Sequence, residues 1–224
     1  QMCIRDGTGP PGMTAGLVPE LLAFARRLLG RADVPQTFVL NALVPVDFAL
    51  WQLWNAKRGN GTFDALCASF CPELTNREKE LGSIPLITYH TPEDELHALL
   101  EDGAFLLKVK IGSDPEKNGD PEAMLAWDIG RLRTVHTAAA GFTTPYTECG
   151  RPVYYLDANG RYPDREFLLR FLDAADKMDA LERIVLLEEP FAGDRSEPVH
   201  GLPVRVAGDE SAHSAQDVAC LTRE

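Results

Sequence analysis

The stretch LLKVKIG at residues 106–112 is the first of four apolar runs that end in polar or charged residues. The others are YLDANG at 155–160, LLEEP at 186–190 and AGDES at 207–211. Charge at the C-terminal end of a barrel strand is typical of an active site, because that face of a (β/α) barrel carries the catalytic loops. Carboxylates on several successive strand ends indicate a hard divalent cation, usually Mg²⁺. Two lysines beside such a cation indicate proton transfer.

Strand and helix patterns alternate from residue 84 onward. Such alternation is typical of parallel βαβ units. The stretch 140–152 has no period and is interpreted as an inserted loop. The sequence therefore predicts an α/β fold, a partial (β/α)₇β barrel of the TIM type. Its strands are expected at about 84–88, 105–111, 153–157, 184–188 and 204–207, and its helices at 92–103, 121–139, 164–182 and from 214 to 222.

The first part of the chain has helical patterns only. Residues 17–29 and 41–58 are apolar at helical spacing, and Pro45 is placed near the start of the second helix because a proline inside a helix is costly. We predict two domains, a helical one at 1–82 and a barrel portion at 83–224. Since the chain opens without Met and stops in a helix pattern, we expect a fragment of a longer protein.

Composition argues against several classes of protein. The formal net charge of −12 disfavours a nucleic-acid partner, which selects a basic surface. The apolar stretches are judged too short for a membrane span, and no signal peptide pattern opens the chain. The five cysteines lack the spacing of a disulfide framework. We therefore expect a cytoplasmic protein with no nucleic-acid or membrane partner.

The strand-end residues are candidates for chemistry because of which face they share. Residues two apart on a strand point the same way, so Lys108 pairs with Lys110, and Asp157 with Asn159. The alternative for the lysines is a solvated edge strand, where lysine prevents aggregation. The alternative for residues 157–160 is a simple turn, since Asp-Ala-Asn-Gly is favourable turn chemistry.

The two acidic pairs follow the same logic. Glu188 and Glu189 are adjacent, so only one of them faces the barrel interior, and Asp209 with Glu210 repeats the pattern. From Asp157 to Glu188 is 31 residues, and from Glu188 to Asp209 is 21. Each separation is about one βα unit, so successive strands are expected to supply one carboxylate each.

These motifs together resemble the enolase superfamily, and within it the muconate-lactonizing-enzyme-like and dipeptide-epimerase-like group. The helix VDFALWQLWNAKRG at 46–59 is also similar to a helix of that family. The resemblance covers about residues 36–224. It implies that the helical domain is the remnant of an α+β capping domain and that the barrel follows it. The N-terminal β-meander and a second catalytic lysine on a later strand have no counterpart in this chain.

The resemblance also implies roles for individual residues. Asp157, Glu188 and Asp209 would bind Mg²⁺, Lys110 would be the general base and Lys108 its supporting cation. Asn159 and Glu210 would contact these groups without binding the metal ion themselves. In this family a lysine base removes a proton next to a substrate carboxylate while Mg²⁺ stabilises the resulting charge. A nearby cation and partial burial both lower the pKa of a lysine, as a base requires.

A lysine base favours the muconate-lactonizing-like group, and within that group we expect racemase or epimerase chemistry on a small carboxylate substrate. Cycloisomerase, dehydratase and o-succinylbenzoate-synthase-like lyase reactions remain alternatives within the superfamily. A catalytically inert truncated barrel is the alternative from another class. The full-length protein is expected to form a homo-oligomer. We expect the chain alone to be inactive, because five strands leave two open sheet edges.

Overall fold

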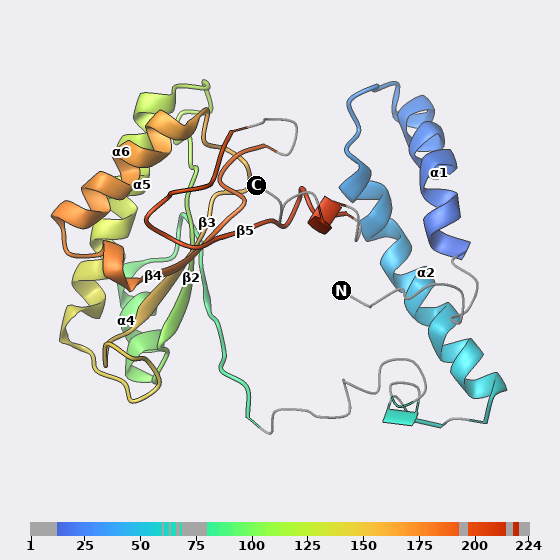
Figure 1. Ribbon diagram of the computed structural model, residues 1–224, viewed down its shortest axis with the longest axis horizontal. Helices are drawn as coiled ribbons and strands as arrows, with labels where there is room; N and C mark the ends of the chain where they lie inside the picture. Colours follow the sequence, from blue (N-terminus) through green and yellow to red (C-terminus); the bar gives the residue numbers. More distant parts are fainter. Residues whose placement is uncertain are drawn as a thin grey trace. The chain divides into compact units, whose positions relative to one another are not determined.

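The computed structural model describes residues 13–59, 61, 62, 64, 65, 68, 80–192, 197–213 and 217–219. The chain divides into two compact units, Gln1–Leu81 and Gly82–Glu224 (Figure 1). Most of residues 62–79, and most of the helix predicted at 214–222, lie outside the described residues.

The second unit is built on one parallel sheet of five strands in the order β1-β2-β3-β4-β5. This confirms the predicted α/β fold and the order of its strands. The edge strands β1 and β5 are short, and the three central strands have five residues each. The bounds are β1 Leu86–Ile87, β2 Leu106–Lys110, β3 Val153–Asp157, β4 Ile184–Glu188 and β5 Val206–Ala207.

Alternation along each strand separates the two faces of this sheet. One face is fully buried and apolar, and α4 Glu93–Glu101, α5 Pro121–Ala138 and α6 Arg165–Lys177 lie along one side of the sheet (Figure 1). Burial of these side chains is the main favourable term in folding. The opposite face carries Lys108, Lys110 and Asp157. The buried side chains that alternate with them include Ile87, Leu107, Val109, Ile111, Tyr154, Leu156 and Leu187.

Local signals explain where the sheet-covering helices begin and end. Asp120 accepts hydrogen bonds from the first turn of α5, and Pro121 follows it at the first helical position. Asp164 caps α6, because its side chain accepts a hydrogen bond from Phe167 N in the first turn. The prediction that this helix extends to 182 is wrong. It ends at Lys177 because Asp179 adopts φ of 59°, and a short 3₁₀ turn at Leu181–Arg183 leads into β4.

The first unit contains two long helices, α1 Met13–Leu29 and α2 Gln36–Lys57. The placement of Pro45 near the start of a helix is wrong, because α2 begins at Gln36 and continues through Pro45. The proline removes one backbone donor without ending the helix.

The length of α2 also corrects the expectation about membrane spans. This helix is long and apolar enough to cross a membrane, with a mean hydropathy of 1.2 over its most apolar window. Length and composition are the only basis for this assignment, and core helices of water-soluble proteins meet the same test.

Candidate active site

The register of the sheet brings the predicted residues to a single edge. Lys110 lies opposite Asp157 on the neighbouring strand, and Asp157 lies opposite Glu188. Glu188 in turn lies opposite Ala207, two residues before Asp209. One step back along the strands, Lys108 lies opposite Tyr155. Lys110, Asp157 and Glu188 are the last residues of their parallel strands, at the edge where active sites of α/β barrels lie.

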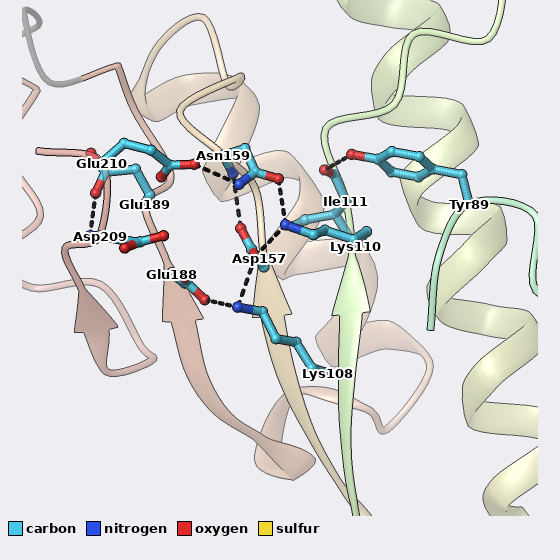
Figure 2. A network of polar contacts seen from close by, with 10 residues as sticks. All are labelled: Tyr89, Lys108, Lys110, Ile111, Asp157, Asn159, Glu188, Glu189, Asp209 and Glu210. Carbon is cyan, nitrogen blue, oxygen red and sulfur yellow. Dashed lines mark hydrogen bonds and ion pairs between the residues drawn. The ribbon is translucent and has the colours of Figure 1, made fainter. Parts of the chain in front are cut away.

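Lys108 joins two of the predicted metal ligands. Its Nζ lies 2.5 Å from Glu188 Oε2 and 2.9 Å from Asp157 Oδ2 (Figure 2). The side chain of Asp157 is 1% exposed and that of Glu188 is 5% exposed. Burial alone lowers the pKa of Lys108, but hydrogen bonds to Glu188 and Asp157 outweigh it and raise that pKa above its usual value. Lys108 is therefore a cation at neutral pH.

Lys110 makes a second set of contacts on the same face. Its Nζ donates to Asp157 Oδ2 at 2.5 Å and to Asn159 Oδ1 at 2.7 Å. The amide of Asn159 donates to Glu210 Oε1 at 2.7 Å, which links β3 to the segment after β5 (Figure 2). Burial raises the pKa of Asp157, and the hydrogen bonds from Lys110 and Lys108 more than offset this, so the pKa is lowered. Asp157 is therefore held as a carboxylate.

Glu189 has a different role from its neighbour Glu188. Its backbone adopts φ of 40°, and its Oε2 accepts from Asp209 N at 2.6 Å and from Ser211 Oγ at 2.9 Å. Glu189 thus fixes the segment after β5, whereas Glu188 pairs with Lys108 (Figure 2). The pKa of Asp209 is raised by burial, by a hydrogen bond with Glu188 and by the nearby carboxylates. These contacts place Asp209 beside Glu188.

The donor chemistry at this edge fits a divalent cation. Carboxylates from three strand ends converge, and Oε2 of Glu210 is buried with no hydrogen-bond partner among the described residues. As they stand, no three His, Cys, Asp or Glu side chains of the described part of the chain are arranged to enclose a metal ion. Lys108 instead lies between two of the carboxylates. Metal binding by Asp157, Glu188 and Asp209 stays a prediction.

Tyr155 belongs to the site, although the sequence motifs did not point to it. Its ring lies 4.8 Å from Lys108 Nζ. Burial, together with a hydrogen bond to Glu188, raises the pKa of Tyr155 to about 12. Tyr155 is two residues before Asp157 and therefore on the same face, which is the signal that could have identified it.

Comparison with known proteins identifies the fold. A mandelate racemase/muconate lactonizing enzyme from Roseiflexus sp. is 26% identical with a TM-score of 0.50, and the match covers 64% of this chain and 36% of that one. A candidate mandelate racemase from Bordetella bronchiseptica RB50, complexed with 2-oxoglutarate/phosphate, is 21% identical with a TM-score of 0.53, covering 93% of this chain and 50% of that one.

The chain thus spans between about a third and a half of these two relatives. No protein-family profile matches the sequence, and no curated protein matches it significantly. The predicted resemblance is nevertheless confirmed by the solved structures. By its fold, the chain is a partial counterpart of the mandelate racemase/muconate lactonizing enzymes of the enolase superfamily.

Proposed function

We propose that this protein removes a proton from the carbon next to a substrate carboxylate, with Mg²⁺ as cofactor, and returns it in a racemisation or epimerisation. The observation that carries the proposal is the position of Lys108 and Lys110. Both ammonium groups lie on one face at the carboxyl edge of the sheet, and both are paired with Asp157. Because the two lysines bind one shared buried acid, a role in proton transfer explains them better than the prevention of aggregation at a solvated sheet edge.

Asp157, Glu188 and Asp209 would hold the metal ion. When bound, Mg²⁺ would supply a positive charge that stabilises the substrate carboxylate as negative charge develops on it. Glu189 would keep Asp209 in place for this role, because it accepts hydrogen bonds from the backbone of Asp209 and from Ser211.

Lys110 would take the proton at Nζ. Its contacts with Asp157 and Asn159 hold the amine at a fixed position. A base in such a position contributes about 10²–10⁴-fold to the rate. Lys108 is held as a cation by Glu188 and Asp157, so it would remain charged and stabilise the developing negative charge. The two lysines would therefore have different roles.

The test measures loss of the α-proton in D₂O. Small carboxylates, including N-acyl amino acids and dipeptides, are incubated with the polypeptide as the cell produces it, with Mg²⁺ or with EDTA. We expect deuterium incorporation that needs Mg²⁺ and falls by about 10²–10⁴-fold in Lys110→Ala. Chiral analysis of the product then separates racemisation from cyclisation or dehydration. Exchange at an undiminished rate in Lys110→Ala would remove that residue from the role of base.

The cellular setting is part of the same proposal. A small carboxylate as substrate and a homo-oligomeric state are taken from the family resemblance, and a cytoplasmic location is consistent with cysteines that lack a disulfide framework. Fractionation of cells, followed by detection of the protein in the soluble or the membrane fraction, tests the location against the apolar character of α2.

A further inference from the structure

Asp128 is a buried carboxylate on α5, away from the charged face of the sheet. The residue is 0% exposed and lies within the apolar layer between α5 and the strands. Its Oδ2 accepts from Gly112 N at 2.7 Å and from the hydroxyl of Tyr162 at 3.0 Å. Its Oδ1 accepts from Ser113 N at 3.2 Å. One carboxylate therefore ties a helix to the segment after β2 and to the segment after β3.

These partners lie close to the proposed base in the sequence. Gly112 is two residues after Lys110, and Tyr162 is three residues after Asn159, which accepts a hydrogen bond from Lys110. Gly112 adopts φ of 78°, and a Cβ there would lie 2.8 Å from the carbonyl oxygen of Ala158. The segments after β2 and β3 are thus in direct contact beside Asp128.

The same short segment is held from its other side. Tyr89 donates from its hydroxyl to Ile111 O at 2.8 Å (Figure 2). Arg161 donates to Gly112 O and to the Tyr89 hydroxyl, both at 3.2 Å. The backbone that directly follows Lys110 is therefore fixed at three consecutive residues, with Asp128 accepting two of their N–H groups.

We propose that Asp128 is a positioning residue, whose ionised carboxylate fixes the ends of β2 and β3 so that Lys110 meets Asp157 and Asn159. The proposal rests on the proposed role of Lys110 as base. All three partners of Asp128 are donors, so only the ionised form can accept from each of them without presenting a hydrogen of its own. Asp128 would act through the backbone and would not touch the substrate.

The protonation state of Asp128 follows from its surroundings. Burial raises its pKa to about 6, although the hydrogen bonds from Gly112, Ser113 and Tyr162 and the charge of Arg161 act in the opposite direction. The groups that face it are Arg161, Tyr162 and, further out, Tyr89. The phenols of Tyr162 and Tyr89 have raised pKa values, so they stay neutral near pH 6. Protonation of Asp128 below about pH 6 is therefore expected to relieve the buried charge and at the same time to weaken the hydrogen bonds that this carboxylate accepts.

Nuclear magnetic resonance on the full chain tests the proposal without any turnover. Between about pH 4.5 and 8, the amide resonances of Gly112 and Ser113 should move together with a midpoint of about pH 6. The side-chain Cε resonance of Lys110, assigned through Lys110→Arg, should move with the same midpoint. The resonance of Lys117, which is exposed on the nearby loop, should not follow them.

Two variants on the same helix separate positioning from simple stability. In Asp128→Asn the Gly112 amide should lose its pH-6 midpoint, and the Lys110 resonance should be displaced at pH 7.5. Glu122→Gln is the matched control, because Glu122 lies on the exposed side of α5 and should leave both signals unchanged. If Asp128→Asn does not fold, the titration of the unmodified chain still decides.

Two outcomes would overturn the proposal. One is the absence of a midpoint near pH 6 at Gly112. The other is a Lys110 resonance that stays fixed while Gly112 and Ser113 titrate, or that keeps its midpoint in Asp128→Asn. Either result would leave Asp128 as a purely structural group. Absence of deuterium exchange with an intact response at Lys110 would contradict the proposed function and leave the positioning role standing.

Discussion

The two faces of the central sheet use the same strands for different purposes. On the face that packs against the helices, Leu107, Val109 and Leu156 are fully buried. On the other face, Lys108 and Asp157 alternate with them and form ion pairs. Neighbouring residues of one strand therefore contribute either to stability or to the proposed chemistry, and substitutions on the two faces should have effects that separate.

The largest expected effect is on the apolar face. Leu107→Ala truncates a fully buried side chain next to Lys108 in the sequence. It should lower the free energy of unfolding by about 2–5 kcal/mol, because apolar contacts are lost and a cavity remains. Urea denaturation followed by circular dichroism measures the change. The rate of α-proton exchange per folded molecule should stay near that of the unmodified protein. A large loss of rate with unchanged stability would contradict the separation of the two faces.

Lys108→Ala tests the charged face at the adjacent residue. Loss of its positive charge should slow α-proton exchange by an amount equivalent to about 2.7–4 kcal/mol, as for one donor that stabilises developing charge. The variant also leaves Glu188 without the ammonium group now 2.5 Å away. Its melting temperature should therefore fall without Mg²⁺ and recover when Mg²⁺ is added, whereas the rate should not recover. Full recovery of the rate would assign Lys108 to charge balance alone.

Asp128 belongs to the apolar side and should reveal itself through pH. Its pKa is raised to about 6 in the folded protein, above the value of about 4 for an unfolded aspartate. The folded state therefore binds the proton more tightly, and stability from this group is present below about pH 4 and lost as the pH rises through about 6. The span of about two pH units corresponds to about 3 kcal/mol.

The control for this pH dependence is Asp128→Asn, which has no titrating group at the position. As the pH falls from about 7 to about 4.5, the free energy of unfolding of the unmodified protein should increase relative to that of Asp128→Asn. Parallel curves for the two proteins would mean that Asp128 does not titrate in this range. Glu122→Gln should give a curve parallel to that of the unmodified protein, because its carboxylate is on the exposed side of the helix.

The smallest effect is expected outside both faces. Arg170 and Glu122 form an ion pair at 2.7 Å between α6 and α5, with both side chains well exposed. Pairs of this kind are screened by solvent and salt. Arg170→Ala should therefore leave both the melting temperature and the exchange rate unchanged within error. A clear loss of stability would indicate that this pair joins the helices more firmly than its exposure suggests.

The sheet and the proposed site residues were accessible from the sequence because their signals are local. Apolar runs that alternate with helical patterns located β2, β3 and β4, and charge at a strand end selected Lys108, Lys110, Asp157 and Glu188. Two residues apart on a strand means one shared face. This rule alone predicts that the lysines and carboxylates meet once neighbouring strands pair in parallel.

Other features depend on pairing that no local pattern encodes. The bridge from Lys108 to both Asp157 and Glu188 follows from the register of three strands. Asp128 was missed although it interrupts the buried helical series Leu125, Leu132 and Val135, where a charged residue needs buried partners. Pro45 was misplaced because a proline inside a helix is costly, whereas the long helix α2 tolerates that cost.

The sequence separation of the site's contacts has a consequence for the order in which the protein folds. Lys108 pairs with Glu188 across 80 residues, and Lys110 pairs with Asp157 across 47. Contacts of such long range form late, after chain-closure entropy has been overcome. A slip of one residue in β2 would turn both lysines toward α5 and expose Val109 to water. The charged row therefore forms only from correctly registered strands, so a chain that has misfolded in this way cannot gain the proposed site.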